Sequence, residues 1–110
     1  MSSKLTRAAA YVRLLLDDKT PKDQVTILLL TPNPAQLAAL LEIVHNLLHG
    51  QLPLSPAAQQ IVEKRRKILN PLTARKLSAK QKKVLVKKHR QAVLQTLKLA
   101  KQYVLEALEQ

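Results

Sequence analysis

Apolar side chains recur along the first third of this chain at intervals of three and four residues, which is the spacing of one face of an α-helix. The recurrence predicts a first helix over about 4–16 and a second over about 20–30. Thr20 can cap the second helix, and Pro21 fits its first position, where the missing N–H costs nothing. The β-branched run 25–27 also suits a strand, but no partner strand is in sight, so the pattern favours a helix.

Proline, asparagine and glycine divide the middle of the chain. Residues 31–34 form a break, after which a third helix is predicted over about 34–49 with a wide apolar stripe. Gly50 is expected to end this helix in the left-handed conformation. A fourth helix is predicted over about 56–69, with Ser55 as its N-cap and an Asn-Pro pair as its stop.

A long final helix is predicted after a short connecting turn or helix over 72–77. It begins at the N-cap Ser78 and can continue to about Leu108 without meeting Gly or Pro, a length of roughly 45 Å at 1.5 Å per residue. Its second half carries four apolar residues at a four-three-four spacing: Val93, Leu97, Ala100 and Val104. Two interpretations of this stripe stay open. It packs on the N-terminal helices of its own chain, or it pairs two chains as a coiled-coil homodimer.

Composition supports helices throughout the chain. The 110 residues include one Gly, no Phe, no Trp and two Tyr, with abundant Leu, Ala, Lys and Gln. The predicted fold class is therefore all-α, a single domain over 1–110 formed as a compact bundle of about five helices with a long basic C-terminal helix. Charge divides this domain into a near-neutral helical half, 1–52, and a basic helical half, 53–110.

Positive charge is concentrated in one third of the sequence. Fourteen Lys or Arg and no Asp or Glu lie within 64–101, whereas five basic and four acidic residues precede position 60. The formal net charge of +12 is therefore local. Such a segment suits a polyanion, because each cation that neutralises a phosphate also releases a condensed counterion. The predicted nucleic-acid contacts are Lys64, Arg65, Arg66, Lys67, Arg75, Lys76, Lys80, Lys82, Lys83, Lys87, Lys88 and Arg90.

Duplex DNA is the favoured partner for these residues. With only Tyr11 and Tyr103 as aromatic residues, the chain lacks the stacking side chains that hold unpaired bases. We expect contacts to the phosphate backbone without sequence readout, and a helix-turn-helix-like unit over 53–85 is a lesser alternative because its turn lacks Gly. The rival functions are an RNA-binding module, or a minor capsid or scaffold protein whose basic face meets an acidic protein surface. A membrane-active role ranks last, because the apolar residues are needed for a core.

Catalytic and metal-binding groups are scarce. With no Cys and one Gly, the chain offers no thiolate and no Gly-rich phosphate loop. His45 and His49 stand one helical turn apart, as in some metal sites, but no third ligand accompanies them, so a surface pair is the better interpretation. We therefore expect no enzymatic activity, no cofactor and no metal. The N-terminus lacks the apolar centre of a signal peptide, which predicts an intracellular protein that is not secreted, and the basic run 64–67 matches a short nuclear-localisation pattern.

The stretch from about 15 to 90 resembles a known group of proteins. The resemblance rests on the segments 35–50, 52–55, 67–69 and 76–78, together with Leu72, Lys80, Lys82, Lys83 and Leu85. Its most specific part is the helix ending Asn-Leu-Leu-His-Gly, followed after one residue by Leu-Pro-Leu-Ser. These features are similar to those of a small basic protein encoded by Maverick/Polinton-type elements and by the adintovirus-like DNA viruses related to them.

That resemblance implies a protein of a virion or mobile element that acts on DNA or at the capsid interior, in the virion or the host nucleus, and it implies no catalytic residues. The chain departs from the family at its end. It continues with helical character over 91–110, where family members have a Gly-Gly tract and a Gly-rich apolar tail. No processing or membrane-active role is therefore carried over.

Overall fold

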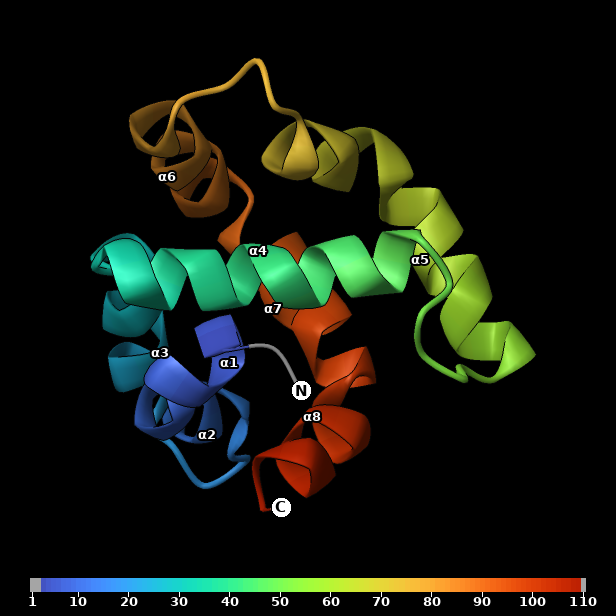
Figure 1. The fold of residues 1–110 in the computed structure, drawn as a ribbon, viewed down its shortest axis with the longest axis horizontal. Helices are drawn as coiled ribbons and strands as arrows, with labels where there is room; N and C mark the ends of the chain where they lie inside the picture. The colour runs from blue at the N-terminus through green and yellow to red at the C-terminus, as the bar shows by residue number, and fades with distance from the viewer. Residues whose placement is uncertain (1–2, 110) are drawn as a thin grey trace.

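A computed structural model describes residues 3–109, and within them the chain forms α-helices, one 3-10 helix and no β-strand (Figure 1). The elements are α1 (Ser3–Arg7), α2 (Ala9–Leu16), α3 (Lys22–Leu30), α4 (Pro34–Leu48), α5 (Pro56–Leu69), η1 (Asn70–Thr73), α6 (Ala79–Lys88), α7 (Arg90–Leu99) and α8 (Lys101–Leu108). The predicted all-α class is confirmed. The described chain has eight α-helices rather than about five.

The extra helices arise because two predicted helices are broken. The first divides at Ala8 into α1 and α2, and the last divides at His89 and Ala100 into α6, α7 and α8. The long basic C-terminal helix was therefore a wrong prediction. A straight helix of about 45 Å would project beyond a body whose longest dimension is 32 Å. The two breaks instead keep the apolar residues of all three segments on the core.

Local capping signals placed most of the other helix ends correctly. Asn33 and Ser78 each form a capping box with the Gln three residues later, and the Ser55 hydroxyl accepts from the Ala58 N–H at 3.2 Å. Gly50 follows α4 with a φ of 65°, and the next N–H bonds back across the helix end, as a left-handed terminator requires.

Thr20 does not cap α3, contrary to the prediction. Helix α3 begins at Lys22, so Pro21 occupies the N-cap position instead of the first helical position. The Thr20 hydroxyl donates to the Leu14 carbonyl at 2.6 Å. This bond ties the α2–α3 connection back to α2 and removes the hydroxyl from the start of α3.

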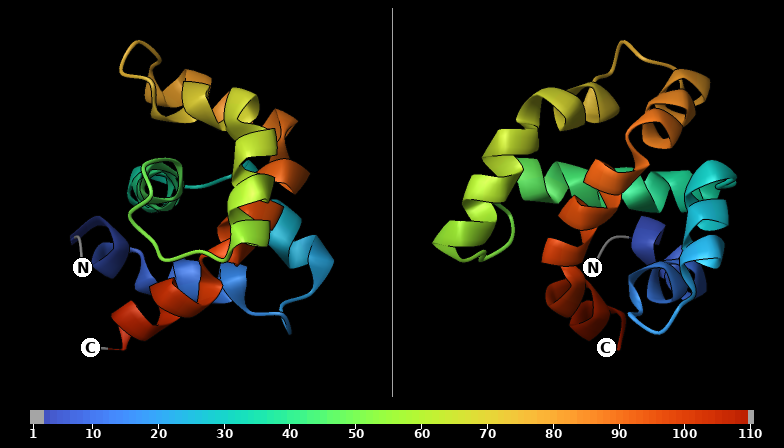
Figure 2. Two further views of the ribbon diagram at one scale, coloured as in Figure 1. Left: turned by 90° about the vertical axis from the view of Figure 1, so that its right-hand side faces the viewer. Right: turned by 180° about the vertical axis from the view of Figure 1, so that it is seen from behind.

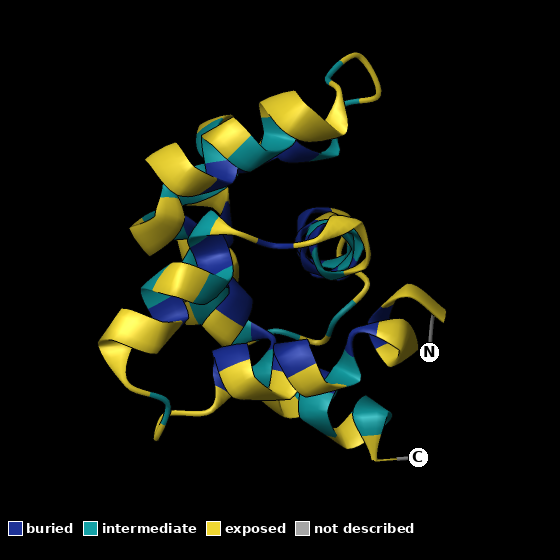
Figure 3. Cartoon of the chain, turned by 90° about the vertical axis from the view of Figure 1, so that its left-hand side faces the viewer, coloured by how far each residue is buried: buried dark blue, intermediate teal, exposed yellow. Residues whose placement is uncertain are grey.

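Helix α4 is the centre of the molecule. It contacts α1 and α2 on one side and α5, η1, α6 and α7 on the other. In Figure 1 it runs across the middle, with α6 and η1 above it, α1, α2 and α8 below it, and α7 behind it. Figure 3 shows that the helices turn their buried positions inward. The near-neutral half and the basic half share one core, because Val62, Leu72 and Leu97 from the basic half pack in the same cluster as the buried residues of α1 to α4.

The apolar stripe of the last predicted helix lies inside this core. Val93, Leu97, Ala100 and Val104 are each at most 4% exposed. The interpretation in which the stripe packs within its own chain is therefore the one observed. A homodimer seam on these four residues has no free surface to use.

No single helix within 3–109 is both long enough and apolar enough to cross a bilayer. Only α3 and α4 taken together reach that length and composition, and a bend of 101° separates them.

Candidate nucleic-acid interface

The twelve predicted contact residues gather on the elements at one end of the molecule. They belong to the C-terminal half of α5, the connection 74–78, α6 and the first residue of α7. The C-terminal end of α5, the start of α6 and the connection between them lie at the top in Figure 1 and in both views of Figure 2, and α6 then runs down toward α4 and α7. We call this end the basic pole, made up of Lys64, Arg65, Arg66, Lys67, Arg75, Lys76, Lys80, Lys82, Lys83, Lys87, Lys88 and Arg90.

Charges of both signs lie together at the opposite end of the fold. The connection between α2 and α3 carries Asp17 and Asp18, and α8 carries Glu106. Both elements lie at the bottom in Figure 1. Lys101 and Lys98 reach Asp18 there, with nitrogen–oxygen distances of 2.7 and 3.4 Å. Their hydrogen bonds lower the pKa of the Asp18 carboxyl, with Lys101 making the larger contribution. The two cations of the basic run that were not predicted as contacts are thus the two that pair at this end.

Arg66 is an exception within the basic pole. It is the only one of the twelve with a carboxylate partner in residues 3–109, because its guanidinium binds Glu63 one turn earlier on α5. The same guanidinium donates to the Leu48 carbonyl at 3.3 and 3.4 Å, at the end of α4. The hydrogen bond from Arg66 lowers the pKa of Glu63. Arg66 therefore holds α5 against α4, and the prediction that it contacts nucleic acid has little geometric support.

Exposure distinguishes the remaining cations. Arg65, Lys82 and Lys83 are half-buried, and the stems of the two lysines line a groove between α6 and α4. The other eight present their charges to solvent: Lys64, Lys67, Arg75, Lys76, Lys80, Lys87, Lys88 and Arg90. Most of the pole is therefore available to an external anion.

A concave site lies where α5 meets the junction of α6 and α7. Its volume is about 370 Å³, and we call it the basic hollow, lined by Arg65, Ile68, Lys88, His89, Arg90, Gln91, Ala92 and Gln95. Arg65 Nη2 donates to Gln95 Oε1 at 3.0 Å, and Arg90 Nη1 donates to the Lys87 carbonyl at 3.2 Å. No carboxylate lines the hollow.

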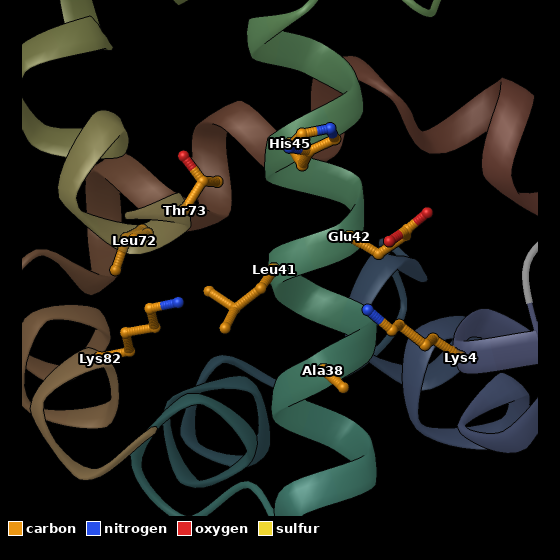
Figure 4. Close-up of a pocket in the computed structure, with 8 residues that line it drawn as sticks. All are labelled: Lys4, Ala38, Leu41, Glu42, His45, Leu72, Thr73 and Lys82. Atoms are coloured by element: carbon orange, nitrogen blue, oxygen red, sulfur yellow. The ribbon is translucent and has the colours of Figure 1, made fainter. Parts of the chain in front are cut away.

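A second hollow lies over the outer face of α4 (Figure 4). Its volume is about 360 Å³, with Lys82 and Leu72 on one side of α4 and Lys4 on the other. Glu42 and His45 also line it, but no hydrogen bond joins them within the described chain. The His45 ring is instead stacked on His49, with 4.1 Å between ring centroids.

The predicted surface interpretation of the histidine pair matches its surroundings. Both His45 and His49 are exposed, and a ring nitrogen of His49 lies 3.0 Å from the His45 carbonyl. Within residues 3–109 no three His, Asp or Glu side chains come together as a metal site.

The sequence patterns did not predict the basic hollow, and the structure argues further against the helix-turn-helix alternative. The hollow depends on the chain break at His89, for which neither Gly nor Pro gives a signal. Residues 70–78 connect α5 to α6, and this nine-residue connection containing η1 is longer than the three or four residues of a helix-turn-helix. The helix-turn-helix-like unit considered over 53–85 therefore lacks the short turn of that motif.

Comparisons with known proteins found no match to any family model, any curated protein or any solved structure.

Proposed function

We propose that this protein binds nucleic acid through its basic pole without catalysing a reaction, and that duplex DNA is its main partner. One observation carries the proposal. The twelve cations of the pole lie close together on a compact molecule. Eleven of them nevertheless have no carboxylate partner within residues 3–109. Such a cluster repels itself until an external polyanion neutralises it, and counterion release then favours binding.

The uneven distribution of charge favours one orientation. Outside the pole the chain has seven Lys or Arg and seven Asp or Glu, so the net charge of +12 comes from the pole. Such a molecule turns its basic end toward a polyanion during approach. The elements α1, α2 and α8, which lie at the other end in Figure 1, would then face away from the duplex. In this orientation the proposed contacts would lie on a limited surface rather than around the whole molecule.

Helix α6 has few of the residue types that read bases. Direct readout relies mostly on Arg or Lys at guanine and on Asn or Gln at adenine. Helix α6 has no Arg and no Asn, and the side chain of its one Gln, Gln81, accepts from the Ser78 N–H at 2.8 Å in the capping box. Its exposed cations, Lys80, Lys87 and Lys88, are point charges suited to phosphates. Backbone-directed binding without sequence preference is therefore proposed.

The resemblance to the mobile-element protein suggests a setting for this binding. A small protein that coats phosphates without reading sequence would serve DNA packaging in a virion core or binding of element DNA in the host nucleus. The rival function, a minor capsid or scaffold protein, would direct the same pole at an acidic protein surface. The competition experiment below distinguishes this role from DNA binding.

Competition between ligands tests the proposal. The protein is titrated with two labelled DNA duplexes of unrelated sequence, with an RNA duplex of equal length, and with a highly acidic protein as competitor. We expect the two DNA duplexes to bind equally well and to compete with each other. Stronger binding to the RNA duplex would make the protein an RNA-binding module, and binding to the acidic protein alone would contradict the proposal in favour of the structural role.

A further inference from the structure

The break between α6 and α7 brings together side chains that a continuous helix would separate. Residues two apart on an α-helix point roughly 200° from each other, so Lys88 and Arg90 would face opposite sides. His89 leaves the helical conformation, with φ −111° and ψ 30°. As a result Lys88, His89 and Arg90 all line the basic hollow.

A third cation enters the same hollow from another element. Arg65 comes from α5 and is oriented by its hydrogen bond to Gln95 on α7. Arg90 is held by its bond to the Lys87 carbonyl. Because both guanidinium groups are positioned before any ligand arrives, less side-chain entropy is lost when they bind one.

The remaining lining is neutral. Gln91 and Gln95 can donate hydrogen bonds through their amide groups, and Ile68 and Ala92 complete the wall. Three cations with no facing carboxylate form a cradle for one multivalent anion. A tetrahedral phosphate oxyanion suits it, because Arg donates in bidentate fashion to phosphate oxygens and Lys adds a point charge.

We infer that the basic hollow seats one phosphate group of the nucleic-acid backbone and anchors the protein on it through Arg65, Lys88 and Arg90. This inference rests on the proposed function. It adds that the pole is not uniform: these three residues hold a phosphate in a defined place, whereas the exposed cations of the connection 74–78 contribute charge alone.

A matched pair of double variants tests the anchor. Lys88→Gln with Arg90→Gln removes one Lys and one Arg from the hollow, and Lys76→Gln with Arg75→Gln removes the same two residue types from the connection. Each lost charge-assisted hydrogen bond corresponds to roughly a tenfold loss of affinity. We expect the hollow variant to lose at least about tenfold more affinity for duplex DNA than the connection variant. Equal losses would overturn the anchor and leave DNA binding by the pole intact.

Titration with inorganic phosphate tests the seat independently of DNA. Backbone amide NMR signals of residues 89–92 should shift in a saturable way with phosphate, and not with chloride at equal ionic strength. The same signals should move with duplex DNA in the wild-type protein and stay still with phosphate in the hollow variant. The absence of a phosphate-specific shift would overturn the inference that the basic hollow binds a phosphate, even if the protein binds DNA. Shifts with phosphate but not with bound DNA would also overturn it, because the hollow would then hold a free phosphate.

Discussion

Arg66 and Lys64 stand two residues apart in the same basic run, but their surroundings assign them different roles. Arg66 is half-buried and bonded to Glu63 and to the end of α4, whereas Lys64 is exposed and has no carboxylate partner in residues 3–109. Replacing Arg66 with Gln should lower the melting temperature and change DNA affinity little. Replacing Lys64 with Gln should lower the DNA affinity and change the melting temperature little. Thermal unfolding and a binding titration on the two variants check this, and a large affinity loss for Arg66→Gln without a change in stability would contradict it.

The buried Tyr11 side chain joins two helices through a single hydrogen bond. Its hydroxyl donates to the Leu28 carbonyl at 2.6 Å and so ties α2 to α3, and burial raises its pKa far above the usual value. Tyr11→Phe leaves that carbonyl without this donor, and we expect a loss of about 1 kcal/mol in the free energy of unfolding at neutral pH.

The raised pKa of Tyr11 also gives stability a dependence on alkaline pH. The folded state favours the neutral phenol, so its contribution is fully present below the ordinary tyrosine pKa of about 10. It is lost as pH rises above that value, because the unfolded state ionises first. Wild-type stability should therefore fall more steeply than that of Tyr11→Phe between about pH 9 and pH 11 in denaturant titrations. Parallel curves for the two proteins would refute this cause.

At the scale of elements, Gly50 sets the end of α4 and the direction of the chain toward α5. A β-carbon placed there would meet nothing within 4 Å, so the positive φ of 65° is the whole penalty for a larger residue. Gly50→Ala should cost roughly 1 kcal/mol of unfolding free energy, and Gly50→Asn less, because Asn tolerates the left-handed conformation. Chemical denaturation measures both, and an alanine variant as stable as the wild type would show that the terminator is dispensable.

Asp18 joins the α2–α3 connection to the junction of α7 and α8. Because Lys101 and Lys98 lower its pKa, its stabilisation is present above the ordinary aspartate pKa of about 3.9 and is lost as pH falls through the lowered value. Asp18→Asn should therefore lower the melting temperature at neutral pH and make no difference at about pH 2. Asp23→Asn, at an exposed carboxylate without an ion pair in residues 3–109, is the control. A pH-independent difference for Asp18→Asn would assign its effect to something other than the ion pairs.

These elements also show which features can be predicted from sequence. The starts of α4, α5 and α6 were predictable, because Asn33, Ser55 and Ser78 each act on the next turn of backbone. The breaks at His89 and Ala100 were not, because they follow from how a long apolar stripe fits a body of limited size.

The candidate site divides in the same way. The concentration of unpaired cations was predictable from charge alone, since no acid interrupts 64–101. The convergence of Arg65, Lys88 and Arg90 was not, because it depends on the break at His89. Nor could the sequence distinguish Arg66 from its neighbours, since the carbonyl it binds belongs to α4.

At the scale of the whole molecule, the separation of charge is the feature on which the function depends. Unpaired cations occupy one end, and Asp18 pairs with Lys98 and Lys101 at the other. Lysines outside the pole should therefore contribute little to DNA binding, although they carry the same charge. If DNA binding depended only on the net charge of +12, lysines inside and outside the pole would contribute equally to the affinity.

The salt dependence of duplex DNA binding in two matched variants tests this claim most directly. One variant replaces Lys64, Lys80 and Lys87 of the basic pole with Gln, and the other replaces Lys4, Lys19 and Lys22, which lie outside it. The slope of log affinity against log salt should have a magnitude near 0.9 for each phosphate neutralised. The pole variant should lose up to about 2.7 from the magnitude of that slope, and the control should keep the wild-type value. Equal slopes in the two variants, or a wild-type affinity that does not change with salt, would contradict the account.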